Sequence, residues 1–151
     1  MKTKFIVNNG EEIKLIIYDT SGQERYRTIS LSTTKICLGL ILVFDVSNKS
    51  TFKNLELWLK DIKENTKDDL IILLGNKVDL PKELWEVTTD EAKAFAEKHQ
   101  LIYFETSAKT KQGINEAFSY VANEAYRKYV TIDDNIKIGG TYKGTRPCIN
   151  K

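Results

Sequence analysis

The sequence predicts a doubly wound α/β domain with a mostly parallel sheet. Continuous apolar runs at residues 36–44, 70–74 and 101–104 are typical of strands that are covered on both faces. Helical patterns separate these runs, and strands that alternate with helices indicate βα units. The length of 151 residues is enough for one domain with a single packed core.

An antiparallel hairpin is predicted at the start of the chain. Two runs of β-favouring residues, 4–7 and 13–17, flank Asn9-Gly10, which is a strong signal for a type I′ turn. The hairpin therefore adds one antiparallel strand to the otherwise parallel sheet.

Three amphipathic helices are predicted between and after the strands. Ser50 is the expected N-cap of the first helix, in which apolar residues recur at spacings of three and four. Thr88 and Glu91 match a capping box at the start of the second helix. The third helix is expected to begin after Gly113.

The chain divides into two parts by composition. Residues 1–129 contain all the predicted strands and helices and form the expected domain. Beyond them the sequence becomes polar and contains glycine, so we expect a flexible C-terminal tail at residues 130–151.

Composition narrows the class of protein. The hydrophobic fraction of 41%, with Gly 8 and Pro 2, excludes collagen-like and wholly disordered chains. The net charge of +2 is too balanced for a dedicated nucleic-acid binder, so no nucleic-acid partner is expected. Two cysteines are too few for a disulfide framework, and a cytoplasmic location is the expectation.

Polar residues directly follow three of the predicted strands. The three segments are Asp19-Thr20-Ser21-Gly22-Gln23-Glu24, Asn76-Lys77-Val78-Asp79 and Glu105-Thr106-Ser107-Ala108-Lys109. Ligands of doubly wound sheets bind outside the carboxyl ends of the strands. We therefore expect these segments to share one ligand-binding edge.

The second and third segments suit recognition of a guanine base. The Asp79 carboxylate can accept two parallel N–H bonds, and guanine offers N1–H and N2–H₂ side by side whereas adenine offers no such pair. Each charge-assisted bond contributes roughly 1.5–3 kcal/mol. The backbone N–H of Ala108 is expected to face guanine O6, and the apolar stems of Lys77 and Lys109 to cover the faces of base and sugar.

The first segment suits the phosphate end of a nucleotide. Asp19 fits a contact to Mg²⁺ through water, because Mg²⁺ keeps most of its water ligands. Gly22 lets the backbone approach a phosphate, and Gln23 can orient an attacking water.

On these residues the chain resembles the Ras-superfamily small GTPases, and the Rab branch most closely. The three segments match the switch II opening, with Ser21 in place of the usual Ala, and the two guanine-recognition motifs. Residues 14–18 and 25–29 are similar to segments that mark Rab proteins, and the resemblance runs from about Lys2 to Lys128.

The resemblance implies a Ras-like fold of the P-loop NTPase type, with GTP or GDP and Mg²⁺ as ligands. It also implies an exchange factor, a GTPase-activating protein and effectors as partners. In a complete member of the family Gln23 would be catalytic, Asp19 would hold Mg²⁺ through water and Gly22 would contact the γ-phosphate. The residues implied to bind the base are Asn76, Lys77, Asp79, Ser107, Ala108 and Lys109.

The sequence departs from the family at the phosphate loop. No G-x-x-x-x-G-K-[ST] occurs in the 151 residues. We therefore expect the first strand, the phosphate loop, the first helix and the switch I threonine to be missing, as in a fragment or an incomplete gene model. Loss of the phosphate contacts implies weak nucleotide binding and no hydrolysis by this polypeptide alone.

Absence of the first strand would also change the pairing within the sheet. In the family it lies centrally, between the strands that correspond to residues 13–19 and 37–45. Its absence would leave two strand edges unpaired, or force them together, and the chain alone would be poorly soluble.

Two functional hypotheses remain at this point. The first is a Rab-like small GTPase, a guanine-nucleotide switch in vesicle traffic, that is inactive as this piece. The alternative is a degenerate GTPase-like binding module without hydrolysis, against which the intact Gln23 and base-reading residues argue.

Membrane attachment depends on a cysteine near the end of the chain. Cys148 stands fourth from the end, in the frame of a prenylation box, but Asn150 and Lys151 are unfavourable there. A peripheral position on endomembranes is expected only if Cys148 carries a lipid.

Overall fold

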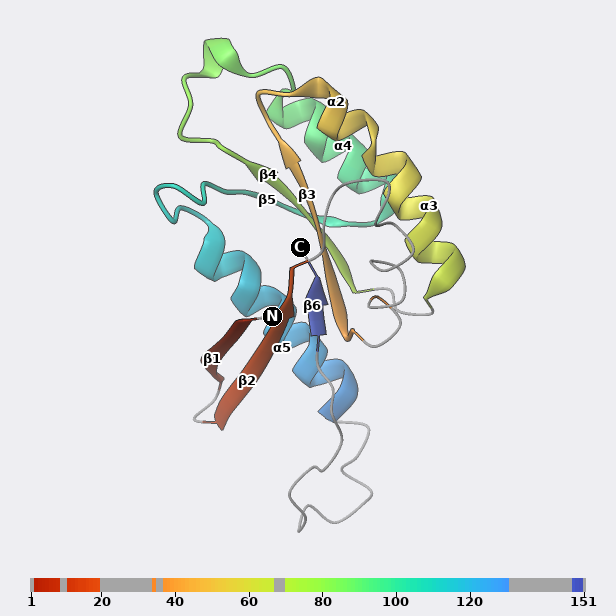
Figure 1. Cartoon of the computed structure of the whole chain (residues 1–151), viewed down its shortest axis with the longest axis vertical. Coiled ribbons are helices and arrows are strands. Elements are labelled where there is room, and N and C mark those ends of the chain that lie inside the picture. The colour runs from red at the N-terminus through yellow and green to blue at the C-terminus, as the bar shows by residue number, and fades with distance from the viewer. Residues whose placement is uncertain are drawn as a thin grey trace.

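A six-stranded sheet runs through the part of the protein that the computed structural model describes, which is residues 2–8, 11–19, 34, 37–66, 70–130 and 148–150 (Figure 1). The strand order is β1-β2-β6-β3-β4-β5. The strands are β1 (Lys2–Asn8), β2 (Glu11–Tyr18), β3 (Gly39–Asp45), β4 (Ile71–Asn76), β5 (Ile102–Glu105) and β6 (Cys148–Asn150). The helices are α2 (Lys49–Lys53), α3 (Leu55–Asn65), α4 (Thr89–His99) and α5 (Ile114–Val130), with a 3₁₀ turn, η2 (Lys82–Leu84).

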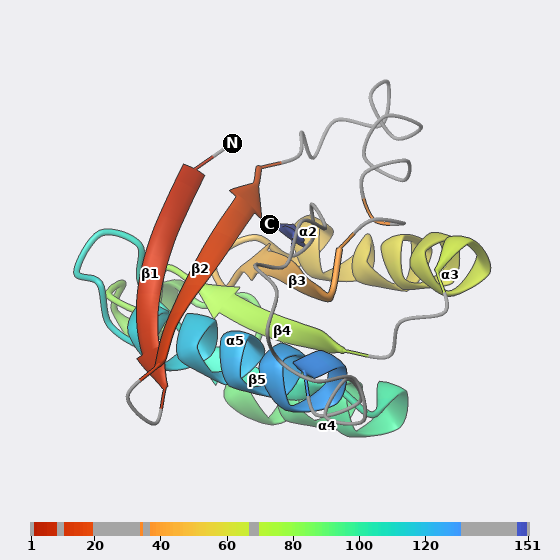
Figure 2. The ribbon, with the colours of Figure 1, turned by 90° about the horizontal axis from the view of Figure 1, so that it is seen from below.

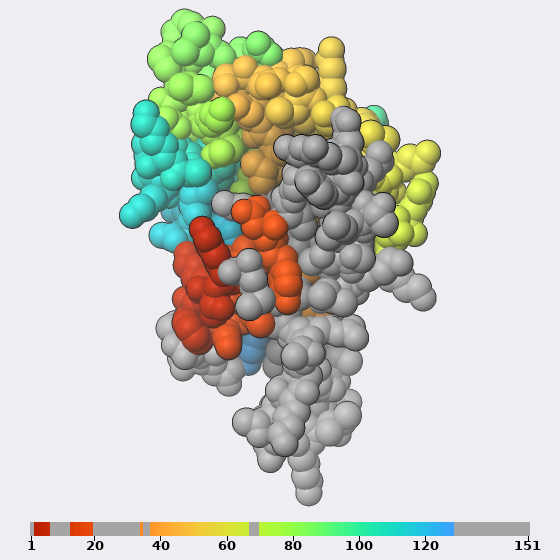
Figure 3. Space-filling view, in the orientation of Figure 1, coloured from red at the N-terminus to blue at the C-terminus, as the bar shows by residue number. Residues whose placement is uncertain are grey.

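The predicted hairpin is confirmed. β1 and β2 pair antiparallel, with Lys2 opposite Ile17 at one end and Asn8 opposite Glu11 at the other. The Asn9-Gly10 turn lies outside the described residues. The hairpin lies at the surface (Figure 3), and the edge strand β1 exposes 55% of Phe5.

The predicted parallel strands are also confirmed. β3 pairs with β4, and β4 with β5, all in parallel. Leu40, Ile41, Ile72 and Leu73 are each 2% exposed or less. The runs at residues 36–44 and 70–74 therefore correspond to strands that are largely covered on both faces. For residues 101–104 the same prediction is wrong, because β5 is the edge strand of the sheet and Ile102 is 46% exposed.

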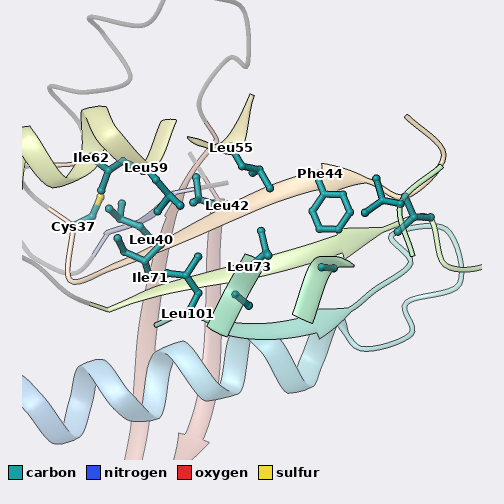
Figure 4. Close-up of a cluster of buried hydrophobic side chains, with 14 residues drawn as sticks. Cys37, Leu40, Leu42, Phe44, Leu55, Leu59, Ile62, Ile71, Leu73 and Leu101 are labelled. Atoms are coloured by element: carbon teal, nitrogen blue, oxygen red, sulfur yellow. The ribbon is translucent and has the colours of Figure 1, made fainter. Parts of the chain in front are cut away.

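Helices cover the two faces of the sheet and divide the core in two. On one face, residues of α3 and α4 such as Leu59 and Ala96 pack with Leu42 and Phe44 of β3 (Figure 4). On the other face α5 packs against β2, β3 and β4, and Figure 2 shows α3 and α5 on opposite sides of β4. This arrangement confirms the doubly wound α/β fold. Within the described residues no helix is both long enough and apolar enough to cross a membrane.

The helix caps partly match the sequence prediction. The capping box is confirmed, since the Thr88 Oγ1 accepts from the Glu91 N–H at 3.2 Å and Glu91 Oε2 accepts from the Thr88 N–H at 3.0 Å. Ser50, however, is not the cap of the helix after β3. Asn48 precedes α2 and its Oδ1 accepts from the backbone N–H of Ser50 at 3.1 Å, so Ser50 is a donor within the first turn.

The C-terminal strand is the main difference from the sequence prediction. Of residues 130–151, for which the sequence predicts a flexible tail, the structure describes Val130, which ends α5, and Cys148–Asn150, which form β6; residues 131–147 and 151 lie outside the described part. β6 lies between β2 and β3 and is parallel to both, so these strands are neither left unpaired nor forced together along residues 16–18 and 39–40. The physical reason is that backbone N–H and C=O groups in the middle of a sheet need partners.

We predict that Tyr103→Phe leaves the free energy of unfolding unchanged or raises it by up to about 1 kcal/mol. The buried Tyr103 hydroxyl has no hydrogen-bond partner in the described structure, and burial, then the Glu105 carboxylate, raises its pKa. The variant removes this desolvated hydroxyl but keeps the ring stacked on Phe44 at 6.4 Å between centroids. Urea unfolding measures the effect.

Phe44→Ala is the control variant, with an expected loss of about 3–5 kcal/mol because Phe44 is 2% exposed. If Tyr103→Phe lost more than about 1 kcal/mol, the hydroxyl would have to be bonded in solution.

Candidate functional site

The polar segments after β4 and β5 lie at one edge of the sheet. Register places Asp45 opposite Asn76, and Gly75 opposite Glu105, so β3, β4 and β5 end at nearly the same level. Figure 1 shows the loops after β4 and β5 leaving the sheet on the same side. The segments at residues 76–79 and 105–109 therefore lie at one edge, as expected for segments that follow the carboxyl ends of parallel strands.

Backbone hydrogen bonds join the two loops. The Thr106 N–H donates to the Gly75 carbonyl at 2.8 Å, and the Val78 N–H donates to the Thr106 carbonyl at 3.1 Å. Thr106 and Ser107 are both fully buried. The loops therefore form one connected unit rather than two independent turns.

Gly113 closes the loop that runs from β5 to α5. Its φ is +67°, and a Cβ added there would lie 2.2 Å from the carbonyl oxygen of Glu105. Only glycine fits this approach without moving the backbone. The same loop is tied at its other end by the Ser107 N–H, which donates to the Gln112 carbonyl at 3.0 Å.

Asn76 and Ser107 act as internal ties between the loops. The Asn76 Oδ1 accepts from the backbone N–H of Ala108 at 3.0 Å. The Ser107 hydroxyl donates to Asp79 Oδ1 at 2.6 Å and accepts from the Thr110 N–H at 3.1 Å. Both side chains thus position neighbouring residues, and the Ala108 N–H, which was expected to face guanine O6, bonds to Asn76 here.

The Asp79 carboxylate is held in its ionised form. The hydrogen bond from Ser107 lowers its pKa and outweighs the opposing effect of burial, and Lys109 lowers it further from 3.8 Å. An ionised carboxylate has about four lone-pair sites, of which the Ser107 hydroxyl uses one. Asp79 can therefore accept further hydrogen bonds.

Two lysines belong to these loops: Lys109 lies beside Asp79, and Lys77 pairs with Asp45. The side chain of Lys109 is 83% exposed and that of Lys77 is 54% exposed. Lys77 has a φ of +70°, which is rare for a residue with a side chain. Its ammonium lies 2.5 Å from Asp45 Oδ2, so the structure fixes the direction of the Lys77 stem.

Asp45 is a residue of this edge that sequence reasoning missed. Burial raises its pKa, but the bond from Lys77 and the two bonds from Ser47, at 2.7 and 2.9 Å, lower it by more, so the net shift is downward. A signal was present in the sequence, because Asp45 directly follows the apolar run at residues 36–44 in the same way as the three chosen segments.

Asp19 lies apart from this cluster. It follows β2 and is exposed, and register places Tyr18 level with Asn150 and Asn150 level with Leu40. Tyr18 and Leu40 are therefore at the same level of the sheet. β3 continues for five more residues to Asp45, which is level with Asn76, so β2 ends well before the edge formed by β3, β4 and β5.

The expected phosphate end is only partly covered by the structure. Gly22 and Gln23 lie outside the described residues. Within the described part of the chain no group of three or more His, Cys, Asp or Glu side chains could hold a metal ion. Of the three residues predicted for the phosphate end, the structure describes Asp19.

The strands that carry this site form a parallel sheet covered by helices, and two polar loops are tied together at its carboxyl edge. These loops carry the sequences Asn-Lys-x-Asp and Thr-Ser-Ala-Lys, which are the guanine-recognition motifs of small GTPases. Residues 1–127 match the Ras family, and the chain belongs to it. The predicted resemblance to Ras-superfamily small GTPases is thereby confirmed.

A comparison with one curated relative gives the identity and the share of each chain that is aligned. The chain is 42% identical over 126 residues to the Ras-related protein RIC2 of Oryza sativa subsp. japonica, an alignment that covers 83% of this chain. It covers 58% of that relative, so the chain spans less than two thirds of the length of the curated relative that it matches.

We predict that Ser107→Ala raises the pKa of Asp79 toward its ordinary value of 3.8, because the hydroxyl that stabilises the ionised form is lost. A lowered folded-state pKa stabilises the fold above the unfolded value, and this contribution is lost as pH falls through the folded value. Acid unfolding of the variant should therefore begin at higher pH. NMR titration of the Asp79 carboxyl carbon gives the pKa.

Ser47→Ala is the matched control, since its hydroxyl bonds to Asp45 at 2.7 Å. It should raise the pKa of Asp45 and leave that of Asp79 unchanged. An Asp79 pKa that stays the same in Ser107→Ala would contradict the assigned hydrogen bond.

Proposed function

We propose that this chain carries the guanine-recognition part of a Rab-type small GTPase, a guanine-nucleotide switch in vesicle traffic. Membership of the Ras family and the 42% identity to a Ras-related protein support the guanine nucleotide as ligand. The similarity of residues 14–18 and 25–29 to Rab segments supports the Rab branch. Exchange factor, GTPase-activating protein and effectors are proposed as partners on the same basis.

The observation that carries the proposal is the Asp79 carboxylate. Its pKa is lowered, one of its oxygens is anchored by Ser107, and it lies at the sheet edge 3.8 Å from the Lys109 ammonium. Such a group pairs with N1–H and N2–H₂ of guanine and has no matching donors on adenine. The anchor is rigid because Ser107 is fully buried, so Asp79 is oriented before a base arrives.

Recognition of guanine O6 requires one local rearrangement. The Ala108 N–H donates to Asn76 Oδ1, which thus occupies the acceptor position that O6 would take. Ala108 is exposed, so a base can reach this N–H from outside. We propose that base binding exchanges the amide oxygen of Asn76 for O6 or shares the N–H between the two acceptors.

The phosphate end of the proposed ligand is assigned by resemblance alone. Asp19, Gly22 and Gln23 are proposed to serve Mg²⁺, the γ-phosphate and the attacking water in the complete protein. No phosphate contact is assigned to the described residues. Two base contacts of about 1.5–3 kcal/mol each correspond to a Kd of roughly millimolar order for the chain by itself.

Membrane attachment is proposed only for a lipid-bearing form. Cys148 is the first residue of β6, and its backbone pairs with that of Ile16 in β2. A lipid anchor at Cys148 therefore requires β6 to leave the sheet. A cytoplasmic protein that associates peripherally with endomembranes is the proposed setting in that case.

We predict that GDP at millimolar concentration shifts the amide NMR signals of Asp79 and Ala108 in the 151-residue chain, whereas ADP does not. Asp79→Asn should weaken the affinity for GDP at least tenfold. The same variant should show signal shifts with xanthosine diphosphate. The reason is that xanthine has a C2 carbonyl, which accepts from the new amide, in place of the guanine N2–H₂ donor.

Glu97→Gln is the control, because Glu97 is exposed near the C-terminal end of α4, the opposite end from Thr89, which bonds to Glu105, and its loss changes the charge equally. It should respond to GDP as the parent chain does. If neither nucleotide shifts any signal at saturating concentration, the alternative of a GTPase-like binding module without nucleotide is the better description.

A further inference from the structure

The backbone on both sides of Lys77 is tied to the neighbouring strand ends. Toward β3, the Val46 N–H donates to the Asn76 carbonyl at 3.1 Å. Toward β5, the Val78 N–H donates to the Thr106 carbonyl at 3.1 Å. Lys77 itself has a φ of +70°, a conformation that residues with a side chain rarely adopt. These ties fix the position of its Cα and the direction in which its side chain leaves the loop.

The far end of the Lys77 side chain is held by Asp45. The ammonium lies 2.5 Å from Asp45 Oδ2, and the side chain of Asp45 is 18% exposed whereas that of Lys77 is 54% exposed. Water therefore competes less for this carboxylate than it does in an ion pair that lies wholly at the surface. With both ends held, the apolar stem of Lys77 extends from the loop after β4 toward the end of β3.

Asp45 is itself oriented by the turn that leads into α2. Its Oδ1 accepts from the Ser47 N–H at 2.9 Å and from the Ser47 hydroxyl at 2.7 Å. Its backbone N–H donates to Thr51 Oγ1 at 3.0 Å, and its carbonyl accepts from the Asn48 N–H at 3.0 Å. The oxygen that accepts from Lys77 is thus the one that the turn does not use.

The two lysines of this edge pair with different carboxylates. The Lys109 ammonium lies 3.8 Å from Asp79 Oδ2, whereas Lys77 pairs with Asp45. Lys77 is only two positions from Asp79 in the chain, so an ammonium released from Asp45 could approach the Asp79 carboxylate. There it would compete with the N–H donors of a base, because an ammonium is a strong partner for a carboxylate.

We propose that Asp45 is a positioning residue of the base site, which holds the Lys77 side chain as one wall of the site and keeps its ammonium away from Asp79. This inference rests on the proposed recognition of guanine. Asp45 is assigned no contact to the base and acts through Lys77. It therefore sets the affinity for a guanine nucleotide, whereas Asp79 sets the preference for guanine over adenine.

Asp45→Asn in the 151-residue chain isolates the ion pair. Asparagine keeps an Oδ1 that accepts both bonds from Ser47, but it loses the charge that holds Lys77. The first measurement uses no nucleotide: acetic anhydride labels the lysines, and mass spectrometry of the peptides gives the rate at Lys77 relative to that at Lys109. We expect this ratio to rise about threefold, because a lysine held against a carboxylate is less free to meet the reagent.

Glu97→Gln is the charge-matched control for this labelling, since Glu97 is exposed near the C-terminal end of α4. It should leave the labelling ratio at its parent value. An unchanged ratio in Asp45→Asn would mean that the carboxylate does not hold Lys77, and the proposal would be overturned.

The second measurement is the affinity for GDP, followed by the amide NMR signal of Ala108. Asp45→Asn should weaken binding about fivefold and still give no response to ADP. A merely structural role is tested in the Lys77→Met background, which keeps an apolar stem without the ammonium. There Asp45→Asn should change the GDP affinity by less than about twofold, because the partner through which it acts is gone.

The outcomes separate this inference from the proposed function. If the parent chain binds GDP and Asp45→Asn binds it equally well, the positioning role is wrong and guanine recognition stands. An equal loss in the parent and Lys77→Met backgrounds would mean that Asp45 acts through the fold rather than through Lys77, which also overturns the proposal. If the parent chain itself gives no response to GDP, the proposed function fails and this inference fails with it.

Discussion

The register of the β3–β4–β5 ladder is the constraint on which the rest of the structure depends. β3 and β4 pair from Leu40 opposite Ile71 to Asp45 opposite Asn76, and a slip by one residue would send every side chain to the wrong face. Both faces are buried under helices, so such a slip would expose apolar residues on each side at once. The same register brings Asp45 level with Asn76 and thereby places the Lys77 ammonium next to a carboxylate.

The polar edge is built by residues that satisfy one another before any ligand binds. Ser107 is fully buried and bonds to Asp79, while Asn76 reaches across 32 positions of sequence to the Ala108 N–H. Placing these groups at the ends of rigid strands limits the freedom that a ligand would otherwise have to remove on binding. The exposed parts of the site are the two lysine stems, whereas the carboxylate that would read a base is mostly covered.

The central position of the sheet shows how strongly unpaired backbone groups are avoided. In the described structure the hairpin shares a core with β3, β4 and α5, whereas its backbone pairing to β3 runs through residues Cys148–Asn150. Backbone N–H and C=O groups of residues 16–18 and 39–40 find partners there in a segment with little apolar patterning of its own.

The sequence by itself determined the features that depend on neighbouring residues. Turn chemistry, unbroken apolar runs and the Thr88 capping box predicted the hairpin, the parallel strands and the start of α4, and the Asn-Lys-x-Asp pattern placed Asp79 at a strand end. Only the tertiary structure decided that Asn48 caps α2, that Asn76 holds the Ala108 N–H and that β6 enters the sheet. The physical reason is that periodicity and caps act over a few positions, whereas these choices depend on which backbone groups from distant parts of the chain meet unpaired.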